Sequence, residues 1–228
     1  DKLIAYDQSP PDQPWQRRVL LAADDGAPEF VATSEELAAR LPRDYTVNRV
    51  YAGEYPPSSP AGDIINAFDA GSLLVNYTGH GNIGEWGIWG SGNRIFQRAD
   101  VTGLRNAGKL PVVTVANCLN GYFVGEPRRV ALAEELQRLP EGGAVAVWAA
   151  SGLEFPAGHR LLIGNFYDAL FQEQIYGLGA ATTSAKIQTY SGSAFWKDLV
   201  NTFMLFGDPA TVLPVPRAAP EPTPDPPD

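Results

Sequence analysis

Five short apolar runs along the chain alternate with segments that have helical features. Such alternation predicts an α/β domain built on a mostly parallel sheet, with helices on both of its faces. The first run, RVLLAA, is apolar along almost its whole length, as a central parallel strand is. With a strand order of 2-1-3-4-5, the ligand crevice is expected where strands one and three end. The five strands are expected at 18–23, 45–51, 72–77, 111–116 and 143–149.

Helices are expected between and after these strands. Thr33 and Glu36 have the spacing of a capping box, and Leu37 and Leu41 would share one face of the helix that follows. A glycine-rich loop is expected at 79–93. The other helices are expected at 63–70, 99–107, 130–138, 159–173, 178–190 and 196–206.

Composition excludes several classes of function. The 228 residues suit one large domain or a compact pair, and the net charge of −9 argues against nucleic acid or an anionic membrane as a partner. No apolar run reaches 18 residues, so we expect no membrane insertion. One cysteine and two histidines do not make a usual structural zinc site, and we expect no metal at the site itself.

The two ends of the chain differ in composition from the middle. Residues 1–16 contain Pro10, Pro11 and Pro14 and are expected to be an irregular lead-in. The start lacks the layout of a signal peptide and reads as an internal fragment of a longer chain. Residues 17–213 are the predicted domain. Residues 214–228 contain seven prolines and are expected to be a linker or tail.

His80 and Cys118 each fall just past the end of a predicted strand. Because parallel strands end at the same edge of a sheet, the sequence predicts a thiol and an imidazole at one edge, as a cysteine nucleophile with a histidine base requires. Each residue also has an ordinary interpretation. Cys118 is alternatively a small buried hydrophobic residue, and His80 a turn histidine. His159, the other histidine, is interpreted as a surface or capping residue and is the competing base.

Acidic residues near the predicted crevice are candidates for orientation and specificity. Asp24 and Asp25 end the first strand, and we prefer Asp24 as the carboxylate that orients or charges His80. Glu29 and Glu154 lie in predicted loops, where an acid in a substrate pocket would select Arg or Lys side chains. The ordinary interpretation of each is solvated surface charge.

Trp86 and Trp89 follow the histidine in the glycine-rich loop and are candidate walls of a substrate groove; otherwise they simply pack the loop. The run from Gly79 to Gly84 has the glycine spacing of a phosphate loop. It lacks a lysine and an acidic ribose partner at the expected distance, so nucleotide binding is not expected.

Four segments resemble the gingipain family of cysteine endopeptidases, which has a caspase-like fold. The match runs from about residue 17 to 213. DIINAFDAGSLLVNYTGHG is similar to the family's histidine segment, and CLNGYF to its nucleophile segment. The stretch from Ala144 to Ser151 is similar to the wall of the primary specificity pocket, and LFGDPA to the segment that closes the catalytic subdomain.

The resemblance implies a three-layer α/β/α sandwich and a cysteine endopeptidase. It implies a thiolate at Cys118, a general acid/base at His80, and an oxyanion hole made by the N–H groups of Gly81 and Cys118. By position, Asp24 resembles the family's acid near the histidine, where Glu is usual. Glu29 falls near the acid of arginine-specific members, so cleavage after Arg or Lys is an expectation. Asn117 stands where a smaller residue such as Ala is usual.

The resemblance also sets the biological context. Members are secreted or surface-exposed bacterial proteins, often with calcium sites, so calcium is expected only as a structural ion and no cofactor is required. Protein or peptide substrates are expected, as are other domains of the same longer chain. The family usually has a further subdomain before this point, of which residues 1–16 would be a remnant.

Other functions stay open on the sequence alone. A sortase-like transpeptidase uses the same pair of residues and differs in the acceptor of the acyl group. A catalytically inactive binding module of a larger secreted protein would keep Cys118 only as an ordinary thiol. A flavodoxin-like cofactor domain is a more distant reading, because Asp24 and Asp25 would repel phosphate.

Overall fold

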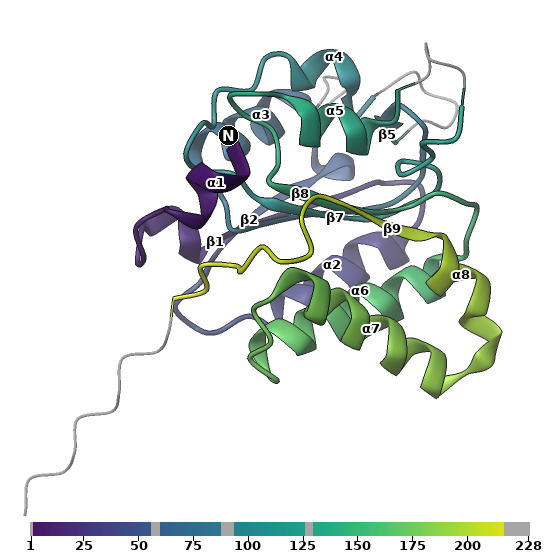
Figure 1. Cartoon of the computed structure of the whole chain (residues 1–228). Coiled ribbons are helices and arrows are strands. Elements are labelled where there is room, and N and C mark those ends of the chain that lie inside the picture. The colour runs from purple at the N-terminus through teal and green to yellow at the C-terminus, as the bar shows by residue number, and fades with distance from the viewer. Residues whose placement is uncertain (1, 56–59, 88–93, 126–129, 217–228) are drawn as a thin grey trace, which may run out of the picture.

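The computed structural model describes residues 2–55, 60–87, 94–125 and 130–216. A six-stranded sheet crosses its centre in the order β2-β1-β3-β7-β8-β9 (Figure 1). Neighbouring strands are parallel except β9, which is antiparallel to β8. The predicted order 2-1-3-4-5 is therefore confirmed for the five parallel strands. Their bounds are β1 Arg18–Ala23, β2 Thr46–Tyr51, β3 Leu74–Thr78, β7 Val112–Ala116, β8 Ala146–Ala150 and β9 Phe203–Phe206.

Helices cover both faces of this sheet and make the expected three-layer α/β/α sandwich. On one face lie α2 (Pro28–Ala38), α6 (Pro156–Phe171) and α7 (Leu178–Gly192) (Figure 1). On the other face lie α3 (Ala61–Ala70), α4 (Arg98–Val101) and α5 (Leu132–Arg138).

The core is divided in two by the sheet. Side chains of β1 alternate between the layers: Val19 and Leu21 pack with the cluster that includes α2 and α6, and Leu20 and Ala22 pack with the cluster that includes α3 and α5. The strand is fully buried after Arg18. A parallel strand that is covered on both faces must be apolar on both, which explains the unbroken run VLLAA.

Helix α2 begins five residues before the predicted capping box. Pro28 occupies its first turn, where the fixed φ of proline suits a helix and the missing N–H costs nothing. Thr33 lies in the middle of the helix and is buried. The capping-box interpretation of Thr33 and Glu36 is therefore wrong, because the proline already supplies the start.

The segment predicted as one helix over 196–206 divides into two elements. Helix α8 covers Lys197–Thr202, and β9 then pairs antiparallel with β8. The run FMLF offers apolar side chains at consecutive positions, which suits an added edge strand better than a helix with one apolar face.

The lead-in is more ordered than the sequence indicates. It forms a short helix, α1 (Lys2–Asp7), and a 3₁₀ turn, η1 (Pro14–Arg17). Tyr6 and Trp15 are both about 5% exposed and pack with the core cluster on the α6 face. The ammonium group of Lys2 donates to the carbonyl oxygens of Leu139 (2.9 Å) and Gly142 (3.0 Å), and partial burial lowers its pKa to about 8.

The glycine-rich loop that follows β3 contains a small second sheet. Strands β4 (Gly81–Asn82), β5 (Glu85–Trp86) and β6 (Phe96–Gln97) pair antiparallel in that order. Because β4 starts immediately after His80, the small sheet fixes the backbone beside the predicted base.

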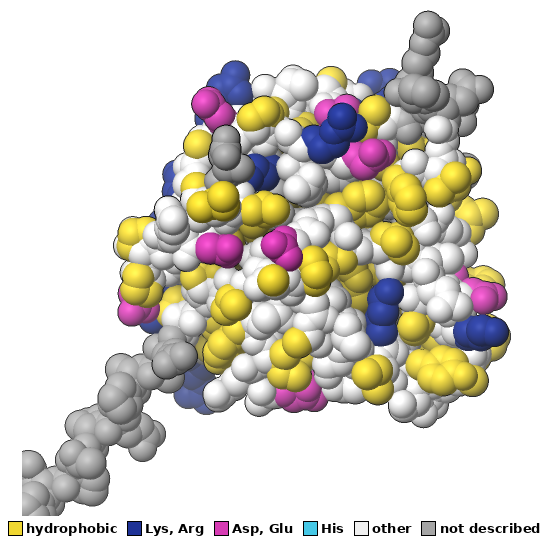
Figure 2. Space-filling model, viewed as in Figure 1, with side chains coloured by type: hydrophobic (Ala, Val, Ile, Leu, Met, Phe, Trp, Pro, Cys, Tyr) yellow, Lys and Arg dark blue, Asp and Glu magenta, His cyan; other side chains and the backbone are white. Residues whose placement is uncertain are grey.

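Charged side chains are dispersed over the surface. On the face seen in Figure 2, acidic and basic side chains stand among hydrophobic ones, and neither sign forms a continuous patch. Within the described ranges, none of the helices combines the length and the apolar character needed to span a bilayer.

Candidate active site

Three predicted catalytic residues meet at the carboxyl edge of the sheet. Strands β1, β3 and β7 are neighbours, with Ala23 paired to Thr78 and Thr78 paired to Ala116. Asp24 follows β1 by one residue, and His80 and Cys118 follow their strands by two. In-register parallel strands that end together bring these three residues to one place.

The backbone of His80 is anchored on both sides. Its main-chain N–H donates to Asp24 Oδ2 over 3.0 Å. Its carbonyl oxygen accepts from the Tyr77 hydroxyl (2.7 Å) and from the main-chain N–H of Gly87 (2.9 Å). Burial, reinforced by the nearby Asp24 carboxylate, raises the pKa of Tyr77 well above its ordinary value. Tyr77 therefore remains a neutral donor at any pH the fold meets.

The imidazole of His80 lies between two elements. The edge of the Phe30 ring, from α2, meets it at a centroid distance of 5.1 Å and an interplanar angle of 85°. On the β1–α2 loop, a Cβ at Gly26 would come within 2.9 Å of His80 Cδ2 and 3.2 Å of Nε2. A side chain at position 26 would therefore displace the ring. Neither contact is predicted from the sequence, because each joins segments that are far apart along the chain.

Asp24 holds the main chain of the histidine loop. While Oδ2 accepts from His80, Oδ1 accepts from the main-chain N–H of Gly26 (3.2 Å). The residue is 6% exposed. One carboxylate thus ties the loop after β1 to the loop after β3. The hydrogen bonds of Asp24 named here go to main-chain groups of the two loops.

Cys118 lies in a constrained turn and is half-buried. Its thiol donates to the main-chain carbonyl of Glu154 at an S···O distance of 3.6 Å. The next residue, Leu119, has φ 65°, a conformation that costs a non-glycine residue about 1–3 kcal/mol. Two main-chain bonds hold this turn to the end of β8: Leu119 N–H to Gly152 (3.2 Å) and Gly121 N–H to Ala150 (2.8 Å).

The main-chain N–H of Gly81 is directed away from its own sheet. Because the Gly87 N–H donates to the His80 carbonyl, the facing pair Gly81–Trp86 is a non-hydrogen-bonded pair of the antiparallel ladder. The N–H of a residue in such a pair points away from the partner strand. The Gly81 N–H therefore points away from β5.

Asn117 lies against this glycine. It is fully buried, and a Cβ at Gly81 would overlap its Nδ2 atom. Neither amide atom of Asn117 has a hydrogen-bond partner in the described part of the chain. The neighbouring Asn120, by contrast, donates from Nδ2 to the carbonyl oxygens of Asn82 and Glu85 (3.3 Å for Glu85).

Comparison with known proteins identifies this arrangement. The family model described as peptidase family C25 matches residues 1–214. The chain belongs to peptidase family C25. Gingipain R2 of Porphyromonas gingivalis is 30% identical to this C25 chain over 150 residues, which are 63% of the chain and 19% of that protein. Gingipain R1 of the same species is 30% identical over 150 residues, which are 14% of its length.

Solved structures agree with the fold of the C25 chain. The crystal structure of the Arg-specific cysteine proteinase gingipain R superimposes with a TM-score of 0.80 at 24% identity, over 93% of this chain and 51% of that one. A complex of the pro- and mature domains of RgpB from Porphyromonas gingivalis gives a TM-score of 0.78 at 24% identity, over 93% and 52%. The caspase-like fold expected from the sequence is confirmed. The C25 chain spans about half the length of these structures.

The β8–α6 loop of the C25 chain carries two predicted pocket residues. The Ser151 hydroxyl donates to the Thr202 carbonyl (2.8 Å), which fixes the start of the loop against the end of α8. Glu154 is half-buried, and its main chain contacts the Cys118 thiol. Burial and the charge of Asp198 raise the pKa of the Glu154 carboxyl. Glu29 is exposed in the first turn of α2.

Two predictions about aromatic and imidazole side chains are wrong. Trp86 is fully buried and stacks on Tyr77 at a centroid distance of 4.7 Å, so it presents no surface to a groove. His159 is 3% exposed, lies in α6 and packs against Phe203, so it is a core residue. Burial lowers its pKa to about 4. Trp89 lies outside the described residues.

Within the ranges that the structure describes, no group of three or more His, Cys, Asp and Glu side chains is arranged to hold a metal ion. Structural calcium therefore has no assigned ligands here.

Proposed function

We propose that this chain is the catalytic part of a cysteine endopeptidase in which Cys118 is the nucleophile and His80 the general acid/base. The proposal rests on one observation above all. The in-register ends of β3 and β7 place the imidazole residue and the thiol residue at the same edge of the sheet. Membership of a peptidase family supports the same conclusion.

The reaction follows from these roles. The Cys118 thiolate attacks the carbonyl carbon of the scissile peptide bond, and the N–H groups of Gly81 and Cys118 donate to the oxygen that becomes negative. The imidazolium of His80 gives its proton to the departing amine as the C–N bond breaks. Water then attacks the thioester while His80 accepts a proton, and the acid product and the thiolate are released.

An acidic pocket wall supports a preference for Arg or Lys before the cut. Glu154 lies in the loop whose main chain contacts the nucleophile, and it is half-buried, so a guanidinium or ammonium group there would form a charge-assisted hydrogen bond. Glu29 is the second candidate for this role. The name of the superimposed relative, an Arg-specific proteinase, is consistent with the same preference.

A panel of fluorogenic peptides tests the activity. The peptides differ only in the residue before the cut, and the proteins are the wild type and Cys118→Ala. Cleavage after Arg or Lys by the wild type alone is the expected result. An amine is also added to the assay. If the amine captures the acyl group, the protein transfers the acyl group and does not only hydrolyse the peptide. Absence of cleavage, together with a Cys118 that reacts with a thiol probe no faster than an unactivated cysteine, would contradict the proposal.

The biological setting proposed here follows from the family. We place the protein outside the cell or at the surface of a bacterium, acting on proteins or peptides, with further domains of a longer chain beside it. Structural calcium remains part of this proposal, and detection of bound calcium by elemental analysis of the purified protein tests it.

A further inference from the structure

We propose that a cationic pocket beside the nucleophile binds a carboxylate in the part of the substrate that follows the scissile bond. The inference rests on the proposed peptidase function and adds a second specificity to it. Its ligand is an acidic side chain, or the terminal carboxylate, of the leaving peptide.

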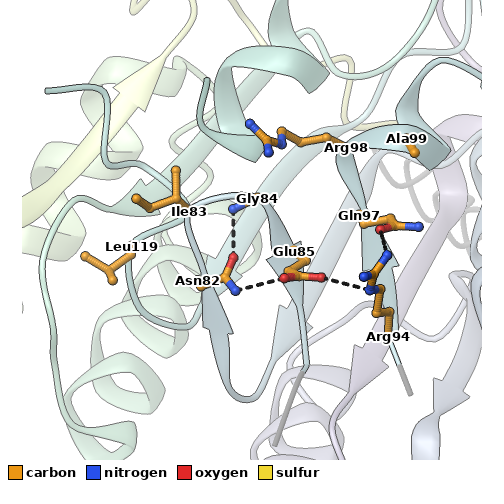
Figure 3. A pocket seen from close by; sticks show the side chains of 9 residues that line it. All are labelled: Asn82, Ile83, Gly84, Glu85, Arg94, Gln97, Arg98, Ala99 and Leu119. Carbon is orange, nitrogen blue, oxygen red and sulfur yellow. Dashed lines mark hydrogen bonds and ion pairs between the residues drawn. The ribbon is translucent and has the colours of Figure 1, made fainter. Parts of the chain in front are cut away.

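The pocket is lined by residues that follow the proposed catalytic groups in sequence. It has a volume of about 630 Å³ and is formed by the small sheet β4-β5-β6, the start of α4 and Leu119. Leu119 follows the nucleophile in sequence, and Asn82 follows the proposed oxyanion donor Gly81. Figure 3 shows Leu119 and Ile83 at one end of the pocket and Arg94 at the other. A peptide bound at Cys118 therefore has this cavity within reach.

The position of the sulfur indicates which part of a substrate the pocket meets. The Cys118 thiol contacts the carbonyl of Glu154, on the β8–α6 side of the nucleophile. Leu119, with its positive φ, lines the cavity on the β4–β5 side. Because the Glu154 side is proposed to take the residue before the cut, the cavity faces the residues after it.

The polar wall of the pocket is a fixed chain of hydrogen bonds and one ion pair. Asn82 Nδ2 donates to Glu85 Oε1 (2.9 Å), Glu85 Oε2 pairs with Arg94 Nε (3.4 Å), and Arg94 Nη1 donates to Gln97 (2.7 Å) (Figure 3). These bonds hold the side chains in place before a ligand arrives, which lowers the entropy cost of binding.

Charge in the pocket favours an anion. The carboxylate of Glu85 balances one of two guanidinium groups, and Arg98 supplies the second. Arg98 lies against Gly84: a Cβ added at Gly84 would be 2.8 Å from Arg98 Nε. The Nη1 atom of Arg98 donates to the carbonyl of Val130 (2.9 Å). Among the residues that line the pocket, two are therefore cationic and one is anionic, in a chain whose net charge is −9. Guanidinium groups bind carboxylates through strong, directional hydrogen bonds.

The opposite side of the nucleophile has the opposite charge. Glu154 lies there, and Asp198 is close enough to raise the pKa of its carboxyl. The crevice is thus polarised from acidic to basic across Cys118. A substrate with a basic residue before the cut and an acidic residue after it matches both ends.

Internally quenched peptides test this inference. They share one sequence up to the cut after Arg and carry Glu, Gln or Lys at the two positions that follow. For the wild type we expect kcat/KM to be about fivefold higher with Glu than with Gln, and lower still with Lys. Arg94→Gln should reduce the Glu-to-Gln ratio towards one, and Glu85→Gln should increase it. Arg138→Gln, in the last turn of α5, is the control that should leave the ratio unchanged.

A substrate with a fluorophore directly after the scissile bond separates the two proposals. It has no leaving peptide, so its hydrolysis reports the peptidase activity alone. If the wild type cleaves it but cleaves the Glu and Gln peptides at equal rates, the pocket proposal is overturned and the peptidase stands. If the wild type cleaves neither kind of substrate, both proposals fail. The pocket proposal is also overturned if the Glu-to-Gln ratio of kcat/KM in Arg94→Gln and Glu85→Gln equals that of the wild type.

Discussion

The Asp24 carboxylate accepts the main-chain N–H of His80 over 3.0 Å and thereby joins the end of β1 to the end of β3. The bond places an acid near the histidine, yet the acid acts on the peptide backbone. Together with the Tyr77 hydroxyl on the His80 carbonyl, it fixes the loop that carries the imidazole before substrate binds. Such preorganisation is what a proton-transfer step requires, because misplacement by 1 Å is costly.

Removing the Asp24 carboxylate should lower kcat more than it raises KM. In Asp24→Ala the His80 N–H loses its acceptor, and we expect kcat to fall by about 10- to 100-fold. In Asp24→Asn the amide oxygen can still accept from the His80 N–H, but the NH2 group then faces the Gly26 N–H, so kcat should fall less than in Asp24→Ala. Steady-state kinetics of both variants measure the difference. Equal losses in the two variants would show that the charge of Asp24 matters more than its hydrogen bond.

Replacing the nucleophile should abolish cleavage without unfolding the protein. Cys118→Ala removes one half-buried sulfur atom, so the free energy of unfolding should change by no more than about 1 kcal/mol. Activity on any cleaved peptide should disappear. Urea denaturation and a peptide assay on the same preparation measure both quantities. Turnover equal to that of the wild type would refute the assignment of Cys118.

Neutralising the pocket acid should weaken cleavage after basic residues. Glu154→Gln should cost at least about 1 kcal/mol, or roughly fivefold in kcat/KM, on Arg substrates and little on neutral ones. Because the pKa of Glu154 is raised, its carboxylate form is lost as pH falls, and the preference for Arg should fade with it. Glu29→Gln, measured in parallel, identifies which acid sets the specificity. Unchanged preference in both variants would exclude both acids.

Two buried asparagines should respond differently to truncation. The amide of Asn117 has no partner among the described residues, so Asn117→Ala should change the free energy of unfolding by less than about 1 kcal/mol. Asn120 Nδ2 bonds the carbonyls of both Asn82 and Glu85, so Asn120→Ala should lower that free energy by about 2 kcal/mol. Chemical denaturation of the two variants gives the comparison. If Asn117→Ala lowers the free energy of unfolding more than Asn120→Ala does, the Asn117 amide has a hydrogen-bond partner outside the described residues.

His159 should make the fold less stable in mild acid. Burial lowers its pKa to about 4 from the ordinary 6.5, so the unfolded chain binds the proton first. Stability should therefore fall as pH drops from about 6.5 to about 4, by about 3 kcal/mol at most from this residue. His159→Leu should lose this part of the pH dependence. Denaturation midpoints across this range, for the wild type and the variant, measure it. Identical profiles would contradict the burial of a neutral imidazole.

Much of the fold was predictable because its strands are covered on both faces. β1 is apolar at every position after its exposed first residue, Arg18, and this run made its bounds readable from the sequence. Periodicity also located α3 and α7 within a few residues. The start of α2 and the division between α8 and β9 were predicted wrongly. The start of α2 is set by a proline in its first turn, and β9 is set by its pairing with β8 at the edge of the sheet. Neither feature can be detected from the periodicity of apolar residues.

The candidate site was predictable only in part. His80 and Cys118 were predicted to lie at one edge of the sheet because residues that follow neighbouring parallel strands share an edge, and the structure places both there. The exposure of a side chain is set by its neighbours in space, so Trp86 was expected to line a groove and His159 to lie at the surface, and both are buried. The contact of Gly26 with the imidazole, likewise, joins segments more than 50 residues apart.

The sequence by itself determined the layered α/β architecture, the order of the parallel strands and the position of His80 and Cys118 at one edge of the sheet. These follow from local apolar runs and from the geometry that all parallel sheets share. Only the tertiary structure decided that Asp24 binds backbone, that the Asn117 amide has no hydrogen-bond partner among the described residues, and that Arg94 and Glu85 line one pocket with Leu119. Such contacts depend on which loops meet at the sheet edge, and residue spacing along a chain does not encode the distance between loops.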